Sequence, residues 1–502
     1  MMLSLITFIP LIGVALMFLV SARLAKVVAL LASLAAFVAS LVMLAGFNPS
    51  ATGYQFVEAA QWIPQYGIGY KLGVDGISVW MVMLTTFIMP IAIGYSWLTI
   101  KDEPGKNERA YYALMLALET ATLGVFLSLD MFLFYVFWEF ALVPMYFIIG
   151  VWGGARRVYA SLKFFIYTMS GSVLMLIAIL VLGGNAKSFD LEVVAKNSGA
   201  FAANIPLFLA FFIAFAIKVP LWPFHSWLPD AHVEAPTAGS IVLAAILLKM
   251  GGYGLIRFNL GLFPQASAQL APFIAVLAII GILYGAVVAF AQSDAKKLVA
   301  YSSVSHMGYV VLGIFSLNQL GLQGAMLQMV NHGLSTGGLF LAIGFIYERL
   351  HTREMVRMGG LWGKMPVYGV VTLLFVLSSV GLPALNGFVG EYVILQGAFL
   401  RDPIWAAFAA LGMIFSAAYL LTFFQKIFLG PAQGESEDAH GHAAHAEAHD
   451  EHGLSDLNWR EVLTALPLIV FCFVIGLFST PFFAAMTASV SQLLSAPGIA
   501  MK

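Results

Sequence analysis

The sequence contains little charge. Only 10% of the 502 residues are Asp, Glu, Lys or Arg, while 61% are hydrophobic and the mean hydropathy is +0.92. A soluble protein of this length would carry about a quarter charged residues. The formal net charge of −1 favours neither an acidic nor a basic partner, so binding to nucleic acid is not expected. The composition predicts a polytopic protein embedded in a lipid bilayer.

Motifs for cofactors and cross-links are also missing. Cys472 is the one cysteine, so the chain can form no internal disulfide and no cysteine-rich zinc site. The sequence has no Walker A motif, no glycine fingerprint after a strand and no Cys-x-x-Cys-His haem motif. Residues 1–20 lack a basic n-region and a small-residue cleavage site, and are expected to form a retained first helix. We therefore expect no metal and no cofactor in this chain.

Long hydrophobic segments are what the chain does contain. A transmembrane helix needs about 20 apolar residues, and fourteen segments approach that length. They lie at residues 2–20, 24–46, 76–100, 110–129, 131–152, 161–183, 204–224, 237–258, 270–291, 297–316, 320–347, 366–400, 404–429 and 460–488. The sequence thus predicts an all-α fold of about 14 transmembrane helices. An even number places both termini on one side of the membrane.

The distribution of basic residues predicts which side that is. Loops after the odd-numbered helices hold sixteen of the 24 Lys and Arg residues, and the opposite side holds six. Because cytoplasmic loops carry the excess of basic residues, both termini are predicted on the non-cytoplasmic side. The two remaining basic residues, Lys218 and Lys249, are predicted inside the membrane.

Two of the predicted helices are interrupted. The seventh, within Ala216–Ser240, contains Lys218 followed by two prolines, and the twelfth contains Pro383 and three glycines within Ser378–Glu391. Proline removes a backbone donor that lipid cannot replace, so a broken helix at membrane depth usually marks an ion or substrate path. The breaks are five helices apart, which predicts two inverted five-helix repeats, the fourth to eighth and the ninth to thirteenth helices.

This organisation divides the chain into five parts. They are residues 1–109 with three helices, 110–258 with the first repeat, 270–429 with the second repeat, 430–459 with a polar loop, and 460–502 with the last helix. The loop holds half of the ten histidines, His440, His442, His445, His449 and His452. Because their spacing matches no fixed ligand set, we interpret the loop as a solvated linker and not as a metal site.

Several ionisable residues lie inside predicted membrane helices, where such residues are rare and often mark proton paths. The predicted relay consists of Glu139, Lys218, Lys249, His306, His332 and Glu391, with His225, Glu119 and His232 as secondary candidates. The alternative for Glu139 and Lys218 is a buried pair that only fixes helix packing. For each histidine the alternative is a hydrogen bond to a neighbouring helix.

The relay hypothesis depends on the separation of two charges. Burial and a neighbouring carboxylate have opposite effects on the affinity of a lysine for its proton. If Glu139 approaches Lys218, the lysine holds its proton; if Glu139 withdraws, the proton is released toward Lys249, then to the two histidines and on to Glu391. Water admitted at the helix breaks would link these groups. Such a relay moves protons laterally and needs no cofactor.

Several strings, in order and at matching spacings, resemble the antiporter-like subunits of respiratory complex I, the NADH–quinone oxidoreductase. They are Phe137-Trp138-Glu139, Lys218-Val219-Pro220, His225-Ser226-Trp227-Leu228-Pro229-Asp230-Ala231-His232, Ala235-Pro236-Thr237-Ala238-Gly239-Ser240, Leu247-Leu248-Lys249 and Ser302-Ser303-Val304-Ser305-His306-Met307-Gly308. The resemblance extends from about the third predicted helix to the last, which is nearly the whole chain.

The resemblance implies a role for each matching residue. Glu139, Lys218 and Lys249 match the family's glutamate of the fifth helix and lysines of the seventh and eighth. Glu391 matches its exit residue in the twelfth, which is glutamate in M-type members and lysine in L-type and N-type members. The resemblance also implies a proton-translocating subunit driven by quinone reduction elsewhere in the complex. Its partners would be the L-type and N-type chains, while other subunits bind NAD, FMN, Fe–S clusters and quinone.

Other interpretations remain open. The related D-type member of multisubunit Na+/H+ antiporters shares the glutamate and lysine of the fifth and seventh helices, although the string ending at Glu391 fits M-type members better. Membrane-bound hydrogenases use the same scaffold. A quinone-binding membrane subunit would be a different class, with His225, His232 and the tryptophans lining a quinone pocket. A polar line that crosses the membrane centre argues against that class.

Overall fold

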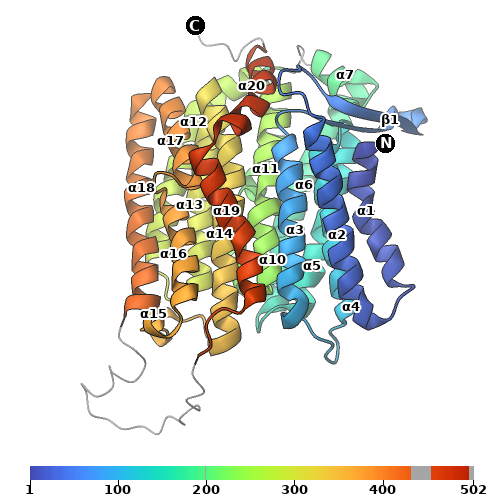
Figure 1. Cartoon of the computed structure of the whole chain (residues 1–502). Helices are drawn as coiled ribbons and strands as arrows, with labels where there is room; N and C mark the ends of the chain where they lie inside the picture. The colour runs from blue at the N-terminus through green and yellow to red at the C-terminus, as the bar shows by residue number, and fades with distance from the viewer. Residues whose placement is uncertain (198, 200, 431–453, 497–502) are drawn as a thin grey trace.

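The computed structural model describes residues 1–197, 199, 201–430 and 454–496. Its helices stand side by side as one bundle, and the chain begins and ends its described part at the same end of that bundle (Figure 1). Within the predicted polar loop, residues 431–453, which include His440 to His452, lie outside the described residues.

The elements are mostly long helices. In chain order the first half consists of α1 (Met2–Met17), α2 (Ala22–Ala45), β1 (Gln55–Ile63), η1 (Pro64–Tyr66), β2 (Ile68–Val74), α3 (Val79–Thr99), α4 (Glu108–Leu127), α5 (Met131–Trp152), α6 (Arg157–Ala186), α7 (Leu191–Lys196), α8 (Ile205–Lys218), α9 (Trp227–Glu234), α10 (Thr237–Val242), η3 (Leu243–Leu247), α11 (Leu248–Gly254) and η4 (Leu255–Leu260). The second half consists of α12 (Pro264–Phe290), α13 (Ala295–Phe315), α14 (Gln319–Leu350), η5 (Met355–Arg357), α15 (Leu361–Lys364), α16 (Pro366–Val380), α17 (Asn386–Arg401), α18 (Pro403–Phe424), η6 (Gln425–Leu429), α19 (Trp459–Leu477) and α20 (Thr480–Leu494). Elements η3, η4 and η6 are π-helical.

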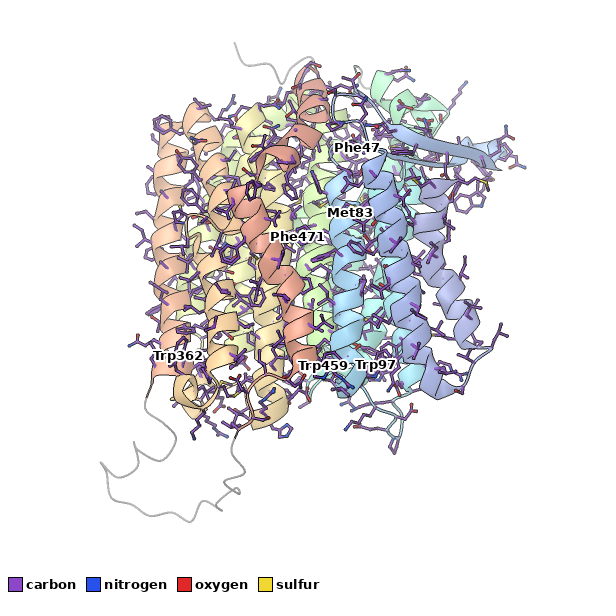
Figure 2. All side chains as sticks on the ribbon, in the orientation of Figure 1. Phe47, Met83, Trp97, Trp362, Trp459 and Phe471 are labelled. Carbon is purple, nitrogen blue, oxygen red and sulfur yellow. The ribbon has the colours of Figure 1, made fainter. Side chains whose placement is uncertain are left out.

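The described chain has the build of a multi-pass membrane protein. Within it, 11 helices are long and apolar enough to cross a membrane, and the shorter apolar helices are Met2–Met17, Ile205–Lys218 and Pro366–Val380. Figure 2 shows Trp97, Trp362 and Trp459 at one level near the lower end of the bundle. Tryptophan gathers where the hydrocarbon core meets the headgroups, so this level fits one membrane interface.

One extramembrane element departs from the all-helical prediction. Strands β1 and β2 pair antiparallel and form a hairpin, with Gly67 at a left-handed φ of 69° between them. Lys71 on β2 donates hydrogen bonds to Asp190 at 2.7 Å and Glu192 at 2.6 Å. Burial acts to lower the pKa of Lys71, but the two carboxylates outweigh it and hold the pKa above its ordinary value. This contact anchors the hairpin to the start of α7.

The chain is interrupted at the prolines of the seventh predicted helix. α8 ends at Lys218 and α9 begins at Trp227. Pro220 and Pro223 have no N–H group, so the carbonyls at the end of α8 need other donors. The indole Nε1 of Trp227 donates to the carbonyl of Ile217 at 2.9 Å. A side chain thus replaces a backbone bond at a depth where lipid offers none.

The twelfth predicted helix is interrupted in a different way. Gly381 ends α16 with a left-handed φ of 84°, and the N–H of Leu382 donates back to the carbonyl of Leu377 at 3.0 Å. This 6→1 bond is typical of a helix end capped by glycine. Across the break, the hydroxyl of Ser378 donates to the side-chain oxygen of Asn386 at 2.5 Å, which joins α16 to α17.

The predicted last helix, 460–488, is two helices. α19 ends at Leu477 and α20 begins at Thr480, with Pro481 in its first turn. Proline is tolerated in a first turn, where its missing N–H would have no partner in the helix, and the break itself falls at Phe478, with φ −131° and ψ 56°. Hydrophobic composition alone does not predict that a helix ends at Leu477.

Two further cations are buried in the described bundle, Arg257 and Lys296, with 7% and 5% of their surface exposed. The sequence analysis counts both with the loop residues, so their burial within the bundle was not predicted. Arg257 donates to the two carboxylate oxygens of Asp75 at 2.8 and 2.7 Å. A bidentate pair of this kind offsets part of the cost of burying both charges, and it joins the N-terminus of α3 to η4.

Replacement Arg257→Met is expected to leave the Asp75 carboxylate buried without a counter-charge and to destabilise the protein by about 3–5 kcal/mol. The midpoint temperature of unfolding, followed for purified protein in detergent, should fall clearly. Lys106→Met, which removes an exposed pair with Glu103, should leave it unchanged. If the Arg257 variant unfolds with the wild type, the pair does not stabilise the bundle.

Candidate functional site

Lys249 lies in one buried span, Thr237–Leu260, that combines α-helical and π-helical segments. Its Nζ donates to the carbonyl of Ala244 at 2.5 Å and lies 2.6 Å from Nδ1 of His332 on α14. A π-helical turn contains an extra residue and redirects backbone groups, and such turns are frequent at functional sites. Here η3 contains Ala244 and therefore supplies a backbone acceptor to a side chain that is fully buried.

A second hydrogen-bonded group joins α13, α14, α17 and α18. Nδ1 of His306 lies 2.7 Å from Oε1 of Glu391, and Nε2 of Gln328 donates to the same oxygen at 2.9 Å. On the other side of the ring, Nε2 of His306 lies 3.3 Å from the hydroxyl of Tyr419. All four side chains are buried. The carboxylate therefore has two polar neighbours at one oxygen, while its Oε2 has no hydrogen-bond partner among the described residues.

The two groups meet at a pair of histidines. The rings of His306 and His332 lie 6.0 Å apart between centroids, at an interplanar angle of 63°. Nε2 of His332 is buried without a hydrogen-bond partner in the described chain. The structure therefore brings four of the sequence-predicted residues, Lys249, His332, His306 and Glu391, into one polar line with a single gap between the rings.

No hydrogen bond among the described residues joins Lys218 or Glu139 to the polar line from Lys249 to Glu391. Lys218 is 1% exposed, and its Nζ lies 5.5 Å from the ring centre of Trp138 and 5.4 Å from that of Phe164. Aromatic faces attract a cation, more strongly when water is excluded. Among the described residues no ion pair within 4.0 Å joins Lys218 to Glu139, whose Oε1 is also unpartnered. The predicted pair is in its separated arrangement here.

The secondary candidates lie apart from one another. The carboxylate of Glu119 on α4 accepts from the hydroxyl of Ser33 on α2 at 3.2 Å. The ring of His225 packs edge-on against Tyr284, with centroids 5.1 Å apart.

The third secondary candidate, His232, stacks on Phe340 with centroids 4.5 Å apart. Neither of its ring nitrogens has a hydrogen-bond partner in the described part of the chain. His232 and His225 thus pack against different neighbours instead of converging on one ring-lined pocket. In the ranges that the structure describes, no group of three or more His, Cys, Asp or Glu side chains could hold a metal ion.

Two residues of the site, Gln328 and Tyr419, were not predicted from the sequence. A signal for Gln328 was present, because it stands four residues before His332 and so on the same face of a helix. Gly390 permits its close approach: a Cβ at that position would lie 2.3 Å from Oε1 of Gln328. Tyr419 carries no comparable signal, since buried tyrosines are common in such helices.

Comparison with known proteins gives matches along the whole chain. Residues 128–416 match a family model described as NADH:quinone oxidoreductase/Mrp antiporter, TM, and residues 2–125 match the amino terminus of NADH-ubiquinone oxidoreductase chain 4. NADH-quinone oxidoreductase subunit M of Rhodobacter capsulatus is 44% identical, over 98% of this chain and 96% of its own. NADH-ubiquinone oxidoreductase chain 4 of Arabidopsis thaliana is 41% identical, over 97% and 95%.

Solved structures agree. A chain of respiratory complex I from Thermus thermophilus with bound NADH matches with a TM-score of 0.85 and 31% identity, over 99% of this chain and 100% of that one. A chain of the Mrp complex from Dietzia sp. DQ12-45-1b has the same TM-score of 0.85 but 21% identity, over 99% and 98%, and shows the shared fold alone. Identity therefore favours the oxidoreductase over the Na+/H+ antiporter. The chain belongs to the subunit M, or chain 4, family of NADH–quinone oxidoreductase membrane subunits.

Proposed function

We propose that this chain translocates protons as a membrane-arm subunit of an NADH–quinone oxidoreductase. The observation that carries the proposal is the polar line from Lys249 through His332 and His306 to Glu391. Quinone reduction in other subunits supplies the driving force, and NAD, FMN, Fe–S clusters and quinone bind there. The full relay comprises Glu139, Lys218, Lys249, His332, His306 and Glu391.

The steps from Lys249 to Glu391 are argued from the distances between neighbouring groups. A proton on Lys249 passes to Nδ1 of His332, 2.6 Å away, along an existing contact. Transfer from His332 to His306 uses a bridging water, because no hydrogen bond joins the two described rings, whose centroids lie 6.0 Å apart. His306 then passes the proton to Glu391 at 2.7 Å. The unpartnered Oε2 of Glu391 is the oxygen from which the proton leaves.

The first half of the relay acts as the switch. With Glu139 beyond ion-pair distance, the charge on Lys218 has the rings of Trp138 and Phe164 beside it and no hydrogen bond among the described residues. A buried cation without a counter-charge or hydrogen bond is expensive, so this arrangement favours release of the proton toward Lys249. Approach of Glu139 would reverse that preference.

Inverted repeats and 14 membrane helices are part of the proposal, and two matching backbone bridges support them. Asp130 bridges Asp190, and Asp294 bridges Glu354. Each bridge has the same two antiparallel hydrogen bonds, Met131 N–H to Phe189 O and Leu191 N–H to Leu129 O in the first, Ala295 N–H to Arg353 O and Met355 N–H to Ser293 O in the second. Asp130 and Asp294 also cap the helices that follow them, α5 and α13.

The two bridges are offset equally in sequence and lie at opposite ends of the bundle, as expected for an inverted repeat. The second pair follows the first by 164 residues at both positions. The first bridge adjoins the β-hairpin and the second follows the end of α14, at opposite ends of the bundle (Figure 1). We further propose that the end with the hairpin and both termini is non-cytoplasmic in a bacterial inner membrane. L-type and N-type subunits would be the neighbours in the membrane arm.

Replacement Lys218→Ala should abolish the switch. In membranes with normal amounts of assembled complex, coupled proton pumping is expected to fall roughly tenfold or more, since a positioned proton-transfer group is worth on the order of 100-fold. NADH oxidation and pumping are measured separately. Lys101→Ala, at an exposed loop position, should leave both rates unchanged. Intact assembly with wild-type rates in the Lys218 variant would disprove the relay.

Substitutions at Glu391 test the exit. Glu391→Gln keeps the shape but cannot carry the proton, and should slow turnover as much as Glu391→Ala. Glu391→Lys should be milder than Glu391→Ala, because an amine restores a group that binds and releases protons. Steady-state pumping in membrane vesicles gives the comparison, and equal activity of the Lys and Ala variants would contradict an exit role.

Gln328→Leu should remove one donor from Glu391 without removing the carboxylate. A hydrogen bond to a charged group contributes about 1.5–3 kcal/mol, so pumping should fall about tenfold. The matched control is Gln323→Leu on the same helix, where the side chain donates to Thr487 at 2.9 Å, outside the line. Similar effects of the two substitutions would mean that Gln328 serves only helix packing.

A further inference from the structure

A network of neutral side chains lies beside Glu391, where α14 packs against the break between α16 and α17 (Figure 1). Its members are Gln328 and Asn331 on α14, Ser378 near the end of α16 and Asn386 at the start of α17. All four are buried, with at most 3% of their surface exposed. Amides and hydroxyls do not ionise near neutral pH, so the network acts by fixing the position of other groups and not by taking up a proton itself.

Asn331 and Asn386 exchange two hydrogen bonds. Nδ2 of Asn331 donates to the backbone carbonyl of Asn386 at 2.8 Å, and Nδ2 of Asn386 donates to the backbone carbonyl of Asn331 at 3.3 Å. The hydroxyl of Ser378 donates to Oδ1 of Asn386 at 2.5 Å, so that the other end of this amide faces α14. These bonds tie the position of Asn331 to both sides of the helix break.

Nδ2 of Asn331 has a second acceptor, the side chain of Gln328. It lies 3.4 Å from Oε1 of Gln328, whose Nε2 donates to Oε1 of Glu391 at 2.9 Å. Oδ1 of Asn331, by contrast, is buried without a hydrogen-bond partner among the described residues. An unpaired amide oxygen in a buried site is unfavourable, and an apolar residue would pack there without it. The position therefore uses the two N–H donors of an amide.

Gly390 brings the backbone of α17 close to both amides. A Cβ at this position would lie 2.3 Å from Oε1 of Gln328 and 2.7 Å from Nδ2 of Asn331, which are the two atoms that meet in the contact. Any side chain at position 390 would therefore collide with one of them. Glycine leaves the two amides in contact with each other and Gln328 within reach of Glu391.

Asn331 determines which end of the Gln328 amide faces Glu391. With its NH2 group toward Glu391, Gln328 donates to the carboxylate and stabilises the ionised form. With its oxygen toward Glu391, it would accept from the protonated acid and stabilise that form instead. In this second orientation the NH2 groups of Gln328 and Asn331 would face each other, donor against donor. The contact with Asn331 therefore disfavours the orientation that retains a proton on Glu391.

We propose that Asn331 is a positioning residue for proton release: it holds Gln328 in the orientation that donates to Glu391, and its bonds to Asn386 make this hold depend on the helix break. The inference rests on the proposed exit role of Glu391 and adds the group that controls when the proton leaves. A shift of α17 relative to α16 would loosen Asn331, free the Gln328 amide to turn and let Glu391 retain its proton.

Asn331→Leu tests the proposal, because leucine has a similar size and no donor. In assembled complex, proton pumping should fall toward the level of Gln328→Leu. Its pH dependence should move to higher pH by about one unit, which corresponds to one hydrogen bond to a carboxylate. The protonation of Glu391 is followed directly by its carboxyl band in infrared difference spectra, assigned by the loss of that band in Glu391→Gln. The band should persist to higher pH by the same amount.

Other titratable groups near Glu391 are unchanged in these variants. In the described structure, those on the elements packed against this part of α17 are His306 and Tyr309 on α13, His332 on α14, Tyr419 on α18 and Cys472 on α19. A shift of the infrared band therefore reports on the Gln328 amide.

Two further variants separate positioning from packing. If Asn331 acts through Gln328, adding Asn331→Leu to Gln328→Leu should cause no further shift. The matched control is Asn318→Ser, which also loses a bond between α14 and α17, the 2.7 Å bond from Nδ2 of Asn318 to the carbonyl of Gly397. Serine keeps the cap that Asn318 provides to α14, and the titration of Glu391 should stay as in the wild type.

The outcomes are distinct from those that test the relay. An unchanged infrared titration in assembled Asn331→Leu would overturn the positioning role, and so would a further shift in the double variant or an equal shift in Asn318→Ser. Wild-type pumping by Glu391→Gln would end the exit role of Glu391, while the infrared titration would still decide whether Asn331 controls its protonation. If Asn331→Leu does not assemble, Asn331→Ser takes its place, since serine is too short to reach Gln328 and adds neither bulk nor charge.

Discussion

Inside a lipid bilayer no water supplies hydrogen bonds, so every polar group at that depth must find its partners in the protein. The site follows from this constraint. Lys249 obtains a backbone acceptor from a π-helical turn, and Glu391 obtains His306 and Gln328. The contacts that make these side chains tolerable are the same contacts along which a proton can move. In the proposed relay, the same hydrogen bonds therefore serve both the burial of these side chains and the conduction of protons.

Lys218 and Glu139, at the other end of the proposed relay, have fewer hydrogen-bond partners. Lys218 has aromatic faces around it but no hydrogen bond, and Glu139 has an unpartnered oxygen. Groups held in this way gain much from a small movement that brings them together, because attraction between charges is strong where water is excluded. In the proposed relay, the hydrogen-bonded groups conduct the proton, whereas the separated pair of Lys218 and Glu139 responds to displacement. In the proposal, the groups with hydrogen-bond partners form the conducting line, and the groups without them form the switch.

Much of this could be predicted from the sequence because charge is scarce. In a chain with 10% charged residues, Lys218, Lys249 and Glu391 stand out in apolar runs, and prolines beside Lys218 mark the break at Trp227. The partners were not predictable. Neutral residues such as Gln328 are common in membrane helices, and only the packing of α14 against α17 tells which one reaches Glu391.

The errors of sequence reasoning have a common physical cause. Lys296 and Arg257 lie within two turns of a helix end, where composition cannot distinguish a loop from a bundle interior. Arg257 is buried because Asp75, far away in the chain, completes its hydrogen bonds. The β-hairpin was not predicted, and its Lys71 pairs with carboxylates that follow α6. In each case a distant partner decides whether a polar residue can be buried.

The matching bridges at Asp130 and Asp294 show how two halves of similar backbone can hold different chemistry. Backbone hydrogen bonds do not depend on the side chain, so the same bridge forms with Asp190 in one half and with Glu354 in the other. The groups of the proposed relay have no such freedom, because each must suit its own neighbours. A symmetric scaffold therefore does not require a symmetric relay. In the proposed repeat, each half contains one helix break, and the side chains around it are a lysine with aromatic rings in one half and histidines with a carboxylate in the other.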